Sequence, residues 1–437
     1  MLNIFKNHIN KNLSFLKESK ILIAISGGID SVILTHLCHS LNLNIALAHC
    51  NFNLRGKESD SDENFILQLA ENLDVEVFIE HFDTEIYAKT NKLSIQMAAR
   101  ELRYNWFEAL SKQLQCDYIL TAHHADDNLE TFLINFTRGT GIDGLTGIPE
   151  INEKFVRPLL PFSSEDIKSY ATTNDIQWRE DSSNASTKYL RNKLRHDVIP
   201  ILKTINPSLL QSFQSTLNNL NDTVDVLKES KKAFLKRAIT TKANNHIAFE
   251  ISEFKKNKNI KAHLFEAFKE YGFTQWQDIV NLLDAETGKL VLSATHRLIK
   301  NRNQLLLSEI RIDNNKVITI SEYKKQVKAP FGILFFDEAD AVFGKRTNVI
   351  FVDKSILKFP LTLRKYNNGD VFYPIGMTGR KKVSKYFKDE KLSLLDKENT
   401  WLLCSGKDIV WVINRRADNR FKVTEKTKQI LKIELGL

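Results

Sequence analysis

The first third of the chain alternates short apolar runs with longer amphipathic stretches. Four runs have the length and composition of buried strands: KILIAI (20–25), NIALAHC (44–50), VEVFIEHF (75–82) and DYILTAHH (117–124). Each is followed by a stretch whose apolar residues recur at helical spacing, such as SVILTHLCHSL and SIQMAARELRYNWFEALSKQL. This order predicts an α/β domain with an open, mostly parallel, Rossmann-like sheet that has helices on both faces.

Polar residues gather where three of these strands end. The stretches are SGGIDS (26–31), HCNFNLRG (49–56) and TAHHADD (121–127). Ligands of open parallel sheets bind at the carboxyl ends of the strands. We therefore expect these three stretches to border one site.

The pattern changes after the first domain, which we assign to residues 1–173. A linker helix region is expected over 174–206 and a helical middle domain over 207–309. A strand-like connector follows over 310–358 and a small, mixed α+β, basic domain over 359–437.

The excess of positive charge lies mainly at the C-terminal end of the chain. The net charge is +9, from 62 Lys and Arg against 53 Asp and Glu, and residues 361–437 hold 17 basic and 9 acidic residues, a net of +8. This segment predicts a polyanionic partner, most simply nucleic acid, with a merely solvated lysine-rich face as the alternative.

Cysteine usage and hydropathy bound the cellular setting. The four cysteines are never within three positions of one another, so neither a disulfide framework nor a zinc ribbon is expected. No apolar run approaches the length of a membrane span, and the N-terminus lacks a signal-like apolar core. We expect a cytoplasmic protein without a membrane partner.

The SGGIDS stretch predicts a phosphate-binding turn. Gly27 and Gly28 permit positive φ and close ligand approach, and the helix that follows begins near Asp30 with free N–H groups. The expected ATP site comprises these residues and their neighbours, with Asp30 also holding a phosphate-bound Mg²⁺: Ser26, Gly27, Gly28, Ile29, Asp30 and Ser31. GTGIDG (139–144) fits a dinucleotide motif by letter, but it follows a helical pattern and is discounted.

The chain also resembles a known family. SGGIDS is similar to the signature of the PP-loop ATP pyrophosphatases, and the longer stretches resemble bacterial tRNA(Ile)-lysidine synthetases: MAARELRYNWF, TAHHADDNLETFLINFTRGTGIDGLTGI, RPLL, WREDSSNASTKYLRNKLRHDVIPIL and LRKYNNGDVFYPIGMTGRKKVSKYFKDEKL. One departure is Phe52, where the family often has a second histidine.

The resemblance implies a carbon–nitrogen ligase that works in two half-steps. ATP adenylates the carbonyl oxygen at ring position two of the wobble cytidine in a minor isoleucine tRNA, with release of diphosphate. The amine of free L-lysine then displaces AMP and leaves lysidine. The implied cofactors are ATP and Mg²⁺, and the implied partners are L-lysine and an isoleucine tRNA with a CAU anticodon. A homodimer is left open.

Individual residues can be assigned to these steps. Asp127 and Glu130 share a helix face and are expected to bind the lysine ammonium, and by resemblance Arg103 receives the carboxylate. Asp30 and Asp127 are the expected catalytic residues, although Asp126 remains an alternative to Asp127 as the base. His123, and with it His124, is expected near ATP. Four arginines are expected to bind phosphates of tRNA or of ATP, with a surface arginine stripe as the alternative: Arg138, Arg157, Arg191 and Arg195. Basic residues of the C-terminal domain are expected to bind tRNA phosphates: Arg380, Lys381, Lys382, Lys385 and Lys388.

Other readings remain open at this point. Another PP-loop tRNA-modifying enzyme, such as a thiolase, would need paired cysteines to handle sulfur, and this sequence has no such pair. A PP-loop amidotransferase or NAD synthetase would leave the basic terminal domain without a purpose. A non-catalytic RNA-binding protein would account for the charge but not for SGGIDS together with HHADD.

Overall fold

The structure is a computed structural model that describes residues 1–436 except 55, 181–189, 244–245, 311–316 and 345. It forms two compact units, Met1–Lys228 and Glu229–Leu437. Part of the predicted linker (181–189) and part of the predicted connector (311–316 and 345) lie outside the described residues. No helix in the described part of the chain is long and apolar enough to cross a membrane.

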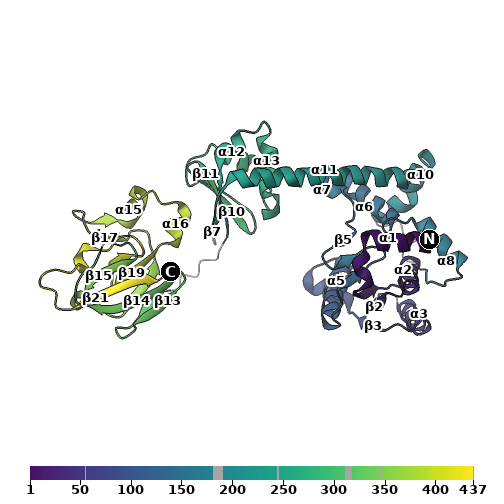
Figure 1. Cartoon of the computed structure of the whole chain (residues 1–437), viewed down its shortest axis with the longest axis horizontal. Coiled ribbons are helices and arrows are strands. Elements are labelled where there is room, and N and C mark those ends of the chain that lie inside the picture. Colours follow the sequence, from purple (N-terminus) through teal and green to yellow (C-terminus); the bar gives the residue numbers. More distant parts are fainter. Residues whose placement is uncertain (55, 181–189, 244–245, 311–316, 345, 437) are drawn as a thin grey trace. The chain divides into compact units, whose positions relative to one another are not determined.

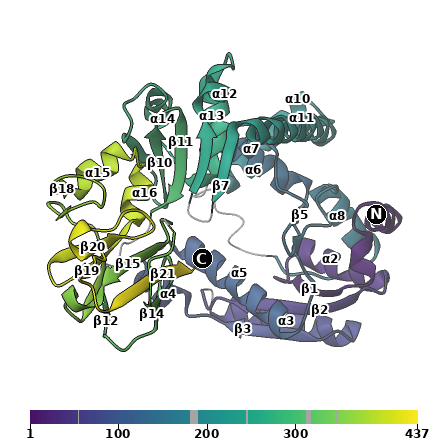
Figure 2. The same ribbon diagram turned by 60° about the vertical axis from the view of Figure 1, so that its left-hand side comes forward.

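The first unit contains the predicted parallel sheet (Figure 1). Its six strands have the order β3-β2-β1-β4-β6-β5, and β5 alone runs antiparallel to its neighbour. Figure 2 shows β1, β2 and β3 running side by side. The strands span Lys20–Ala24 (β1), Asn44–Asn51 (β2), Val77–His81 (β3), Tyr118–Leu120 (β4), Ile151–Asn152 (β5) and Phe155–Val156 (β6).

Helices cover both faces of this sheet, as predicted. Ile21 and Ile23 of β1 face a core formed with α1, α2, α3 and α8, whereas Leu22 faces a second core that includes Phe107 and Leu110 of α5. The helices of the unit are α1 (Leu2–Asn12), α2 (Ile29–Ser40), α3 (Lys57–Leu73), α4 (Thr84–Asn91), α5 (Ile95–Gln113), α6 (Ala125–Thr137), α7 (Ile142–Leu145), α8 (Ser164–Thr173), α9 (Leu190–Lys193), the π-helical turn η3 (Leu194–Val198) and α10 (Ile199–Ile205).

The strand order places the predicted site. It reverses direction between β1 and β4, because the chain moves outward from β1 through β2 and β3 and then returns to the other side of β1. A crevice forms at such a point, at the carboxyl ends of the strands. SGGIDS follows β1 and HHADD follows β4, so both motifs lie at this crevice.

The middle region is helical, as predicted, and also contains a sheet that the sequence analysis missed. The long helix α11 (Leu209–Ala238) leads to α12 (Ile251–Lys255), α13 (Ile260–Phe268) and α14 (Trp276–Leu282). An antiparallel sheet of order β7-β8-β11-β10-β9 packs with them. Its strands are Ile239–Ala243 (β7), His246–Glu250 (β8), Leu290–Leu292 (β9), His296–Asn301 (β10) and Gln304–Glu309 (β11). Short apolar runs such as LLL fit a strand or a helix equally well, which explains the omission.

The C-terminal region is mixed α+β, as predicted. Two four-stranded sheets, β12-β16-β19-β20 and β13-β14-β21-β15, pack around a core that includes Leu363, Trp411, Phe336 and Ile433. Strands of the predicted connector therefore share sheets with strands of the basic segment. The elements are β12 (Ile318–Ile320), β13 (Gln326–Ala329), β14 (Gly332–Ala339), β15 (Val349–Asp353), β16 (Leu361–Lys365), β17 (Val371–Phe372), β18 (Lys381–Lys382), α15 (Val383–Asp389), α16 (Leu394–Asn399), β19 (Trp401–Ser405), β20 (Asp408–Val412) and β21 (Ile430–Gly436).

Candidate active site

The SGGIDS turn has the geometry of a phosphate loop. Gly27 has φ of +85°, a conformation that side chains disfavour, whereas Gly28 is extended and is the N-cap of α2. Helix α2 begins at Ile29, one residue earlier than expected. The first turn of α2 therefore presents its free N–H groups at the end of β1, where an anion can bind.

Two hydroxyl groups hold this turn in shape. The Ser31 hydroxyl donates to the carbonyl of Gly28 at 2.9 Å and lies 3.2 Å from the Ser26 hydroxyl. The Ser26 backbone N–H donates to the Ser31 hydroxyl at 3.2 Å. The sequence analysis assigned both serines to ATP, and the structure adds that they link the two ends of the turn.

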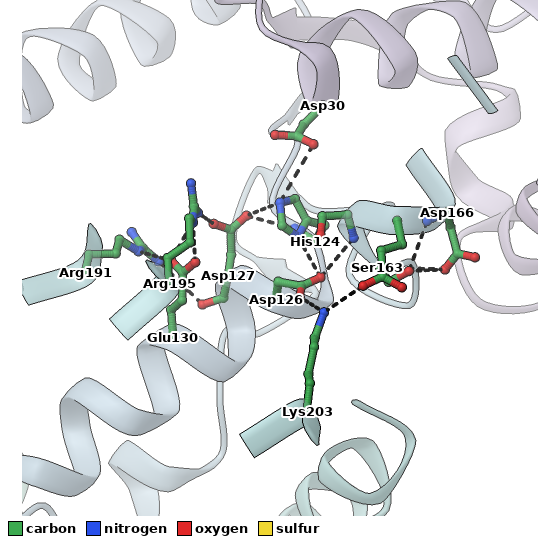
Figure 3. A network of polar contacts seen from close by, with 12 residues as sticks. Asp30, His124, Asp126, Asp127, Glu130, Ser163, Asp166, Arg191, Arg195 and Lys203 are labelled. Carbon is green, nitrogen blue, oxygen red and sulfur yellow. Dashed lines mark hydrogen bonds and ion pairs between the residues drawn. The ribbon is translucent and has the colours of Figure 1, made fainter. Parts of the chain in front are cut away.

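His124 lies among three aspartates at the start of α6 (Figure 3). Its Nε2 is 3.7 Å from Oδ1 of Asp30 and 3.4 Å from Oδ2 of Asp127, and its Nδ1 is 3.7 Å from Oδ2 of Asp126. Nδ1 is buried without a hydrogen-bond partner among the described residues. The motif after β1 and the motif after β4 thus meet through Asp30 and His124.

The two neighbouring aspartates differ in their surroundings. Asp126 accepts a hydrogen bond from the Ser164 N–H at 2.9 Å and one from Lys203 Nζ at 3.1 Å. Burial by itself would raise the pKa of Asp126, but these two donors hold the pKa below its usual range. Asp127 accepts from the His124 N–H at 3.1 Å and from Arg195 Nη2 at 3.3 Å.

Asp30, the carboxylate of the phosphate loop, interacts with both His124 and Asp127. Burial raises the pKa of Asp30, and the negative charge of Asp127 raises it further, although His124 and Arg195 oppose the shift. A cation would relieve this repulsion. Asp30 therefore fits the role of a Mg²⁺ ligand, because Mg²⁺ that arrives with a nucleotide needs only one or two protein carboxylates. Within the described residues, no three or more His, Cys, Asp or Glu side chains are arranged so that they could hold a metal ion together.

Glu130 is completely buried and is occupied by two arginines (Figure 3). Arg191 Nε donates to its Oε2 at 2.8 Å, and Arg195 Nε donates to its Oε1 at 2.6 Å. The structure thus brings Asp127, Glu130, Arg191 and Arg195 into one cluster. The sequence analysis had assigned the acids to lysine and the arginines to tRNA phosphates, and it had not foreseen that they pair with each other.

His123 lies beside this cluster at the end of β4. Its Nδ1 is 3.0 Å from the Thr121 hydroxyl. Burial lowers the pKa of His123 to about 4, and nearby arginines favour the same neutral form. A neutral His123 offers a hydrogen-bond donor or acceptor at the site without adding charge.

The other predicted residues have their own surroundings. The Arg103 guanidinium is 5.2 Å from the centre of the Phe52 ring, which itself stacks on Phe82 at 5.7 Å. Phe52, which departs from the family pattern, is therefore part of a stacked aromatic pair. Arg138 is exposed at the C-cap of α6. In the second unit, Arg380, Lys382, Lys385 and Lys388 are exposed, whereas Lys381 pairs with Asp389 at 2.6 Å.

Two residues that the sequence analysis did not single out support the site. Lys203 of α10 joins Asp126 to Glu165, with Nζ–O distances of 3.1 and 3.2 Å. The Arg179 N–H donates to the carbonyl of Gly27 at 2.9 Å, and its Nε donates to Asp62 at 3.0 Å. Arg179 falls within WREDSS, so the resemblance offered a signal for it. Lys203 had none.

Comparison with known proteins identifies the family. A profile described as the PP-loop domain matches residues 1–202, one described as the TilS substrate binding domain matches 242–310, and one described as the TilS substrate C-terminal domain matches 361–435. The chain belongs to the tRNA(Ile)-lysidine synthase family.

Full-length relatives bear out this membership. The tRNA(Ile)-lysidine synthase of Parabacteroides distasonis is 39% identical over 99% of both chains. That of Bacteroides thetaiotaomicron is 39% identical over 97% of both chains. That of Porphyromonas gingivalis is 36% identical over 95% of this chain and 94% of its own. The resemblance stated from the sequence is thereby confirmed.

Proposed function

We propose that this protein is a tRNA(Ile)-lysidine synthase, an ATP-dependent ligase that adenylates the wobble cytidine of an isoleucine tRNA with a CAU anticodon and joins L-lysine to it. The observation that carries the proposal is the meeting of the phosphate loop with the carboxylates of α6, where Asp30 and Asp127 both approach His124. Family membership over the full chain supports the same activity.

The phosphate loop serves the first half-step. The N–H groups of the first turn of α2 and the hydroxyls of Ser26 and Ser31 bind ATP phosphates, and His123 contacts the nucleotide in its neutral form. Mg²⁺ bound with ATP would be held by Asp30 and would neutralise phosphate charge. The cytidine carbonyl oxygen then attacks the α-phosphorus, and diphosphate leaves. The base must leave its stack to reach the loop.

The carboxylates of α6 serve the second half-step. The lysine ammonium binds at Asp127, and Arg103 receives the carboxylate. Glu130, which the sequence also assigned to the ammonium, is completely buried with both oxygens taken by arginines, so it positions the cluster and does not touch lysine. The ε-amine attacks ring carbon two, the bond to the AMP oxygen breaks, and the amine loses a proton. Asp127 is the better candidate for the base, because Asp126 is held by Lys203 and the Ser164 N–H and its pKa is lowered.

The basic C-terminal region is proposed to bind tRNA. The exposed residues Arg380, Lys382, Lys385 and Lys388 suit phosphate contacts, as do Arg138 and the exposed parts of Arg191 and Arg195. A cytoplasmic location fits an enzyme that acts on tRNA. The number of chains in the assembly, one or two, is to be measured in solution.

Release of diphosphate tests the proposal. The full-length protein should release diphosphate and AMP when tRNA, ATP and lysine are all present, and transfer labelled lysine to the tRNA. A thiolase or an NAD synthetase would not transfer lysine, and a non-catalytic RNA-binding protein would release no diphosphate.

A further inference from the structure

Among the described residues, Arg157 is a buried cation without a carboxylate partner. It follows β6 directly, and the residue is only 7% exposed. Its Nη1 donates to the carbonyl of Pro149 at 2.7 Å, and its Nε has no hydrogen-bond partner among the described residues. No ion pair joins it to an Asp or Glu in the described part of the chain. An unpaired buried charge is costly, so its retention points to an anion that arrives from outside.

A second guanidinium is held next to it. The Tyr104 side chain interacts with Arg157, and the Arg100 guanidinium lies 4.7 Å from the centre of the Tyr104 ring. Tyr104 also packs on Phe155 of β6, with ring centres 4.9 Å apart. Stacking on an aromatic ring leaves the N–H edges of a guanidinium free to bind a planar anion. Arg100 is exposed, so a ligand can reach it.

Arg157 lies close to His123, because β6 pairs with β4 and the two residues follow these strands. The Thr121 N–H donates to the carbonyl of Val156 at 3.0 Å, and the Thr121 hydroxyl is 3.0 Å from Nδ1 of His123. The pKa of His123 responds to Asp127 in one direction and to Arg157 and Arg100 in the other, so all three lie within reach of this one ring. Near His123 the site thus presents the carboxylate of Asp127 and the guanidiniums of Arg157 and Arg100. Groups of both signs suit an amino acid, which carries an ammonium and a carboxylate a few bonds apart.

We infer that Arg100 and Arg157, which both interact with Tyr104, bind the α-carboxylate of the lysine substrate. The inference rests on the proposed function and deepens it, because the sequence assigned this role to Arg103 alone. Arg100 supplies the exposed, two-pronged contact, and Arg157 supplies the buried positive charge behind it. Arg103 belongs to the same helix as Arg100 and lies over the Phe52 ring, and it is then an additional contact to the carboxylate.

A comparison of two amines tests the inference. Lysine and cadaverine, the diamine left when the carboxylate is removed from lysine, are compared as acceptors with the full-length protein, ATP and tRNA. Where cadaverine reacts too slowly, its inhibition of lysine transfer gives the same comparison. The variants are Arg100→Gln and Arg157→Met, and Lys112→Gln removes a positive charge from the far end of the same helix as a control.

The expected result is selective. Arg100→Gln should raise the KM for lysine about 10-fold to 100-fold, as expected when a hydrogen bond to a charged group is removed, and should leave the apparent affinity for cadaverine within about twofold. Arg157→Met should do the same where its thermal melt shows that it folds. Where it does not fold, Arg100→Gln decides alone. Lys112→Gln should match the unsubstituted protein with both amines.

Three results would overturn the inference. Equal losses with lysine and cadaverine would mean that the arginines shape the site without touching the carboxylate. A raised KM for ATP with an unchanged KM for lysine would assign them to phosphates. An unchanged KM for lysine in Arg100→Gln would exclude the contact. If the unsubstituted protein transfers no lysine at all, the proposed function itself is wrong.

Discussion

Arg195 Nε lies 2.6 Å from Oε1 of Glu130, although the two residues are 65 positions apart in the sequence. Glu130 is completely buried, and Arg191 occupies its other oxygen at 2.8 Å. The pairing fixes the segment of α9 and η3 against the start of α6. One carboxylate thereby orients both the cations of that segment and Asp127, which also contacts Arg195.

Glu130→Gln should therefore destabilise the first unit. The substitution keeps the shape but leaves two guanidiniums without their buried negative charge, and we expect a loss of about 1 to 3 kcal/mol in the free energy of unfolding. Urea unfolding followed by circular dichroism measures it. Glu165→Gln is the matched control, because Glu165 is 80% exposed and its pair with Lys203 should contribute less than about 1 kcal/mol. Equal losses in the two variants would contradict the anchoring role.

Asp126 should make the first unit sensitive to acid. Its pKa is lowered in the folded state, so its interactions stabilise the fold above the unfolded pKa of about 3.9 and are lost as the pH falls through the folded pKa. Asp126→Asn should lower stability near neutral pH and flatten the decline below about pH 4. Urea midpoints measured across this range test the expectation. A variant with the same acid dependence as the parent would show that other groups dominate.

The sequence predicted the site motifs better than it predicted their connections. SGGIDS and HHADD are local signals, and the alternation of strands and helices places both at the carboxyl edge of the sheet. The pairing of Glu130 with Arg191 joins residues 61 positions apart, and no periodicity encodes such a pairing. The middle sheet was missed because its short apolar strands fit a helical pattern equally well, and one of its pairings, β8 with β11, spans the helices between them in the chain.

Asp127→Asn should raise the lysine requirement sharply. Loss of the carboxylate removes both an ammonium ligand and the proposed base, so adenylated tRNA should accumulate or hydrolyse. Arg103→Ala should also raise the lysine requirement, with a smaller effect on the rate at saturating lysine. Transfer of labelled lysine, measured against lysine and ATP concentrations separately, checks both. A shift in ATP dependence with unchanged lysine dependence would show that the pocket is misassigned.

The basic C-terminal residues should control the salt dependence of tRNA binding. Neutralising Arg380, Lys382 and Lys385 together should weaken binding and flatten the slope of log affinity against log salt by about 0.7 to 0.9 for each phosphate that the variant no longer neutralises. The matched control neutralises Lys6, Lys11 and Lys17, which are exposed near the N-terminus. Filter binding at several salt concentrations gives the slopes. Equal slopes for both triple variants would favour a merely solvated face.

A deletion test of the same region must respect the fold. Strand β21 pairs with both β14 and β15, so a chain that ends near Asp353 would lack the strand between them. Removing the chain from Ile318 onward takes away both C-terminal sheets as a whole. This deletion should impair tRNA binding more than ATP binding, because the phosphate loop lies in the first unit.

The most direct test of the whole account is the mass of the wobble nucleoside after reaction. Isoleucine tRNA with a CAU anticodon is incubated with the protein, ATP, Mg²⁺ and lysine. The tRNA is then digested to nucleosides, which are separated and measured by mass spectrometry. The account predicts that the wobble cytidine gains the mass of one lysine less one water. One diphosphate and one AMP should be released for each modified tRNA. Asp30→Ala should form no product while it still binds tRNA. An unchanged cytidine, or full product from Asp30→Ala, would contradict it.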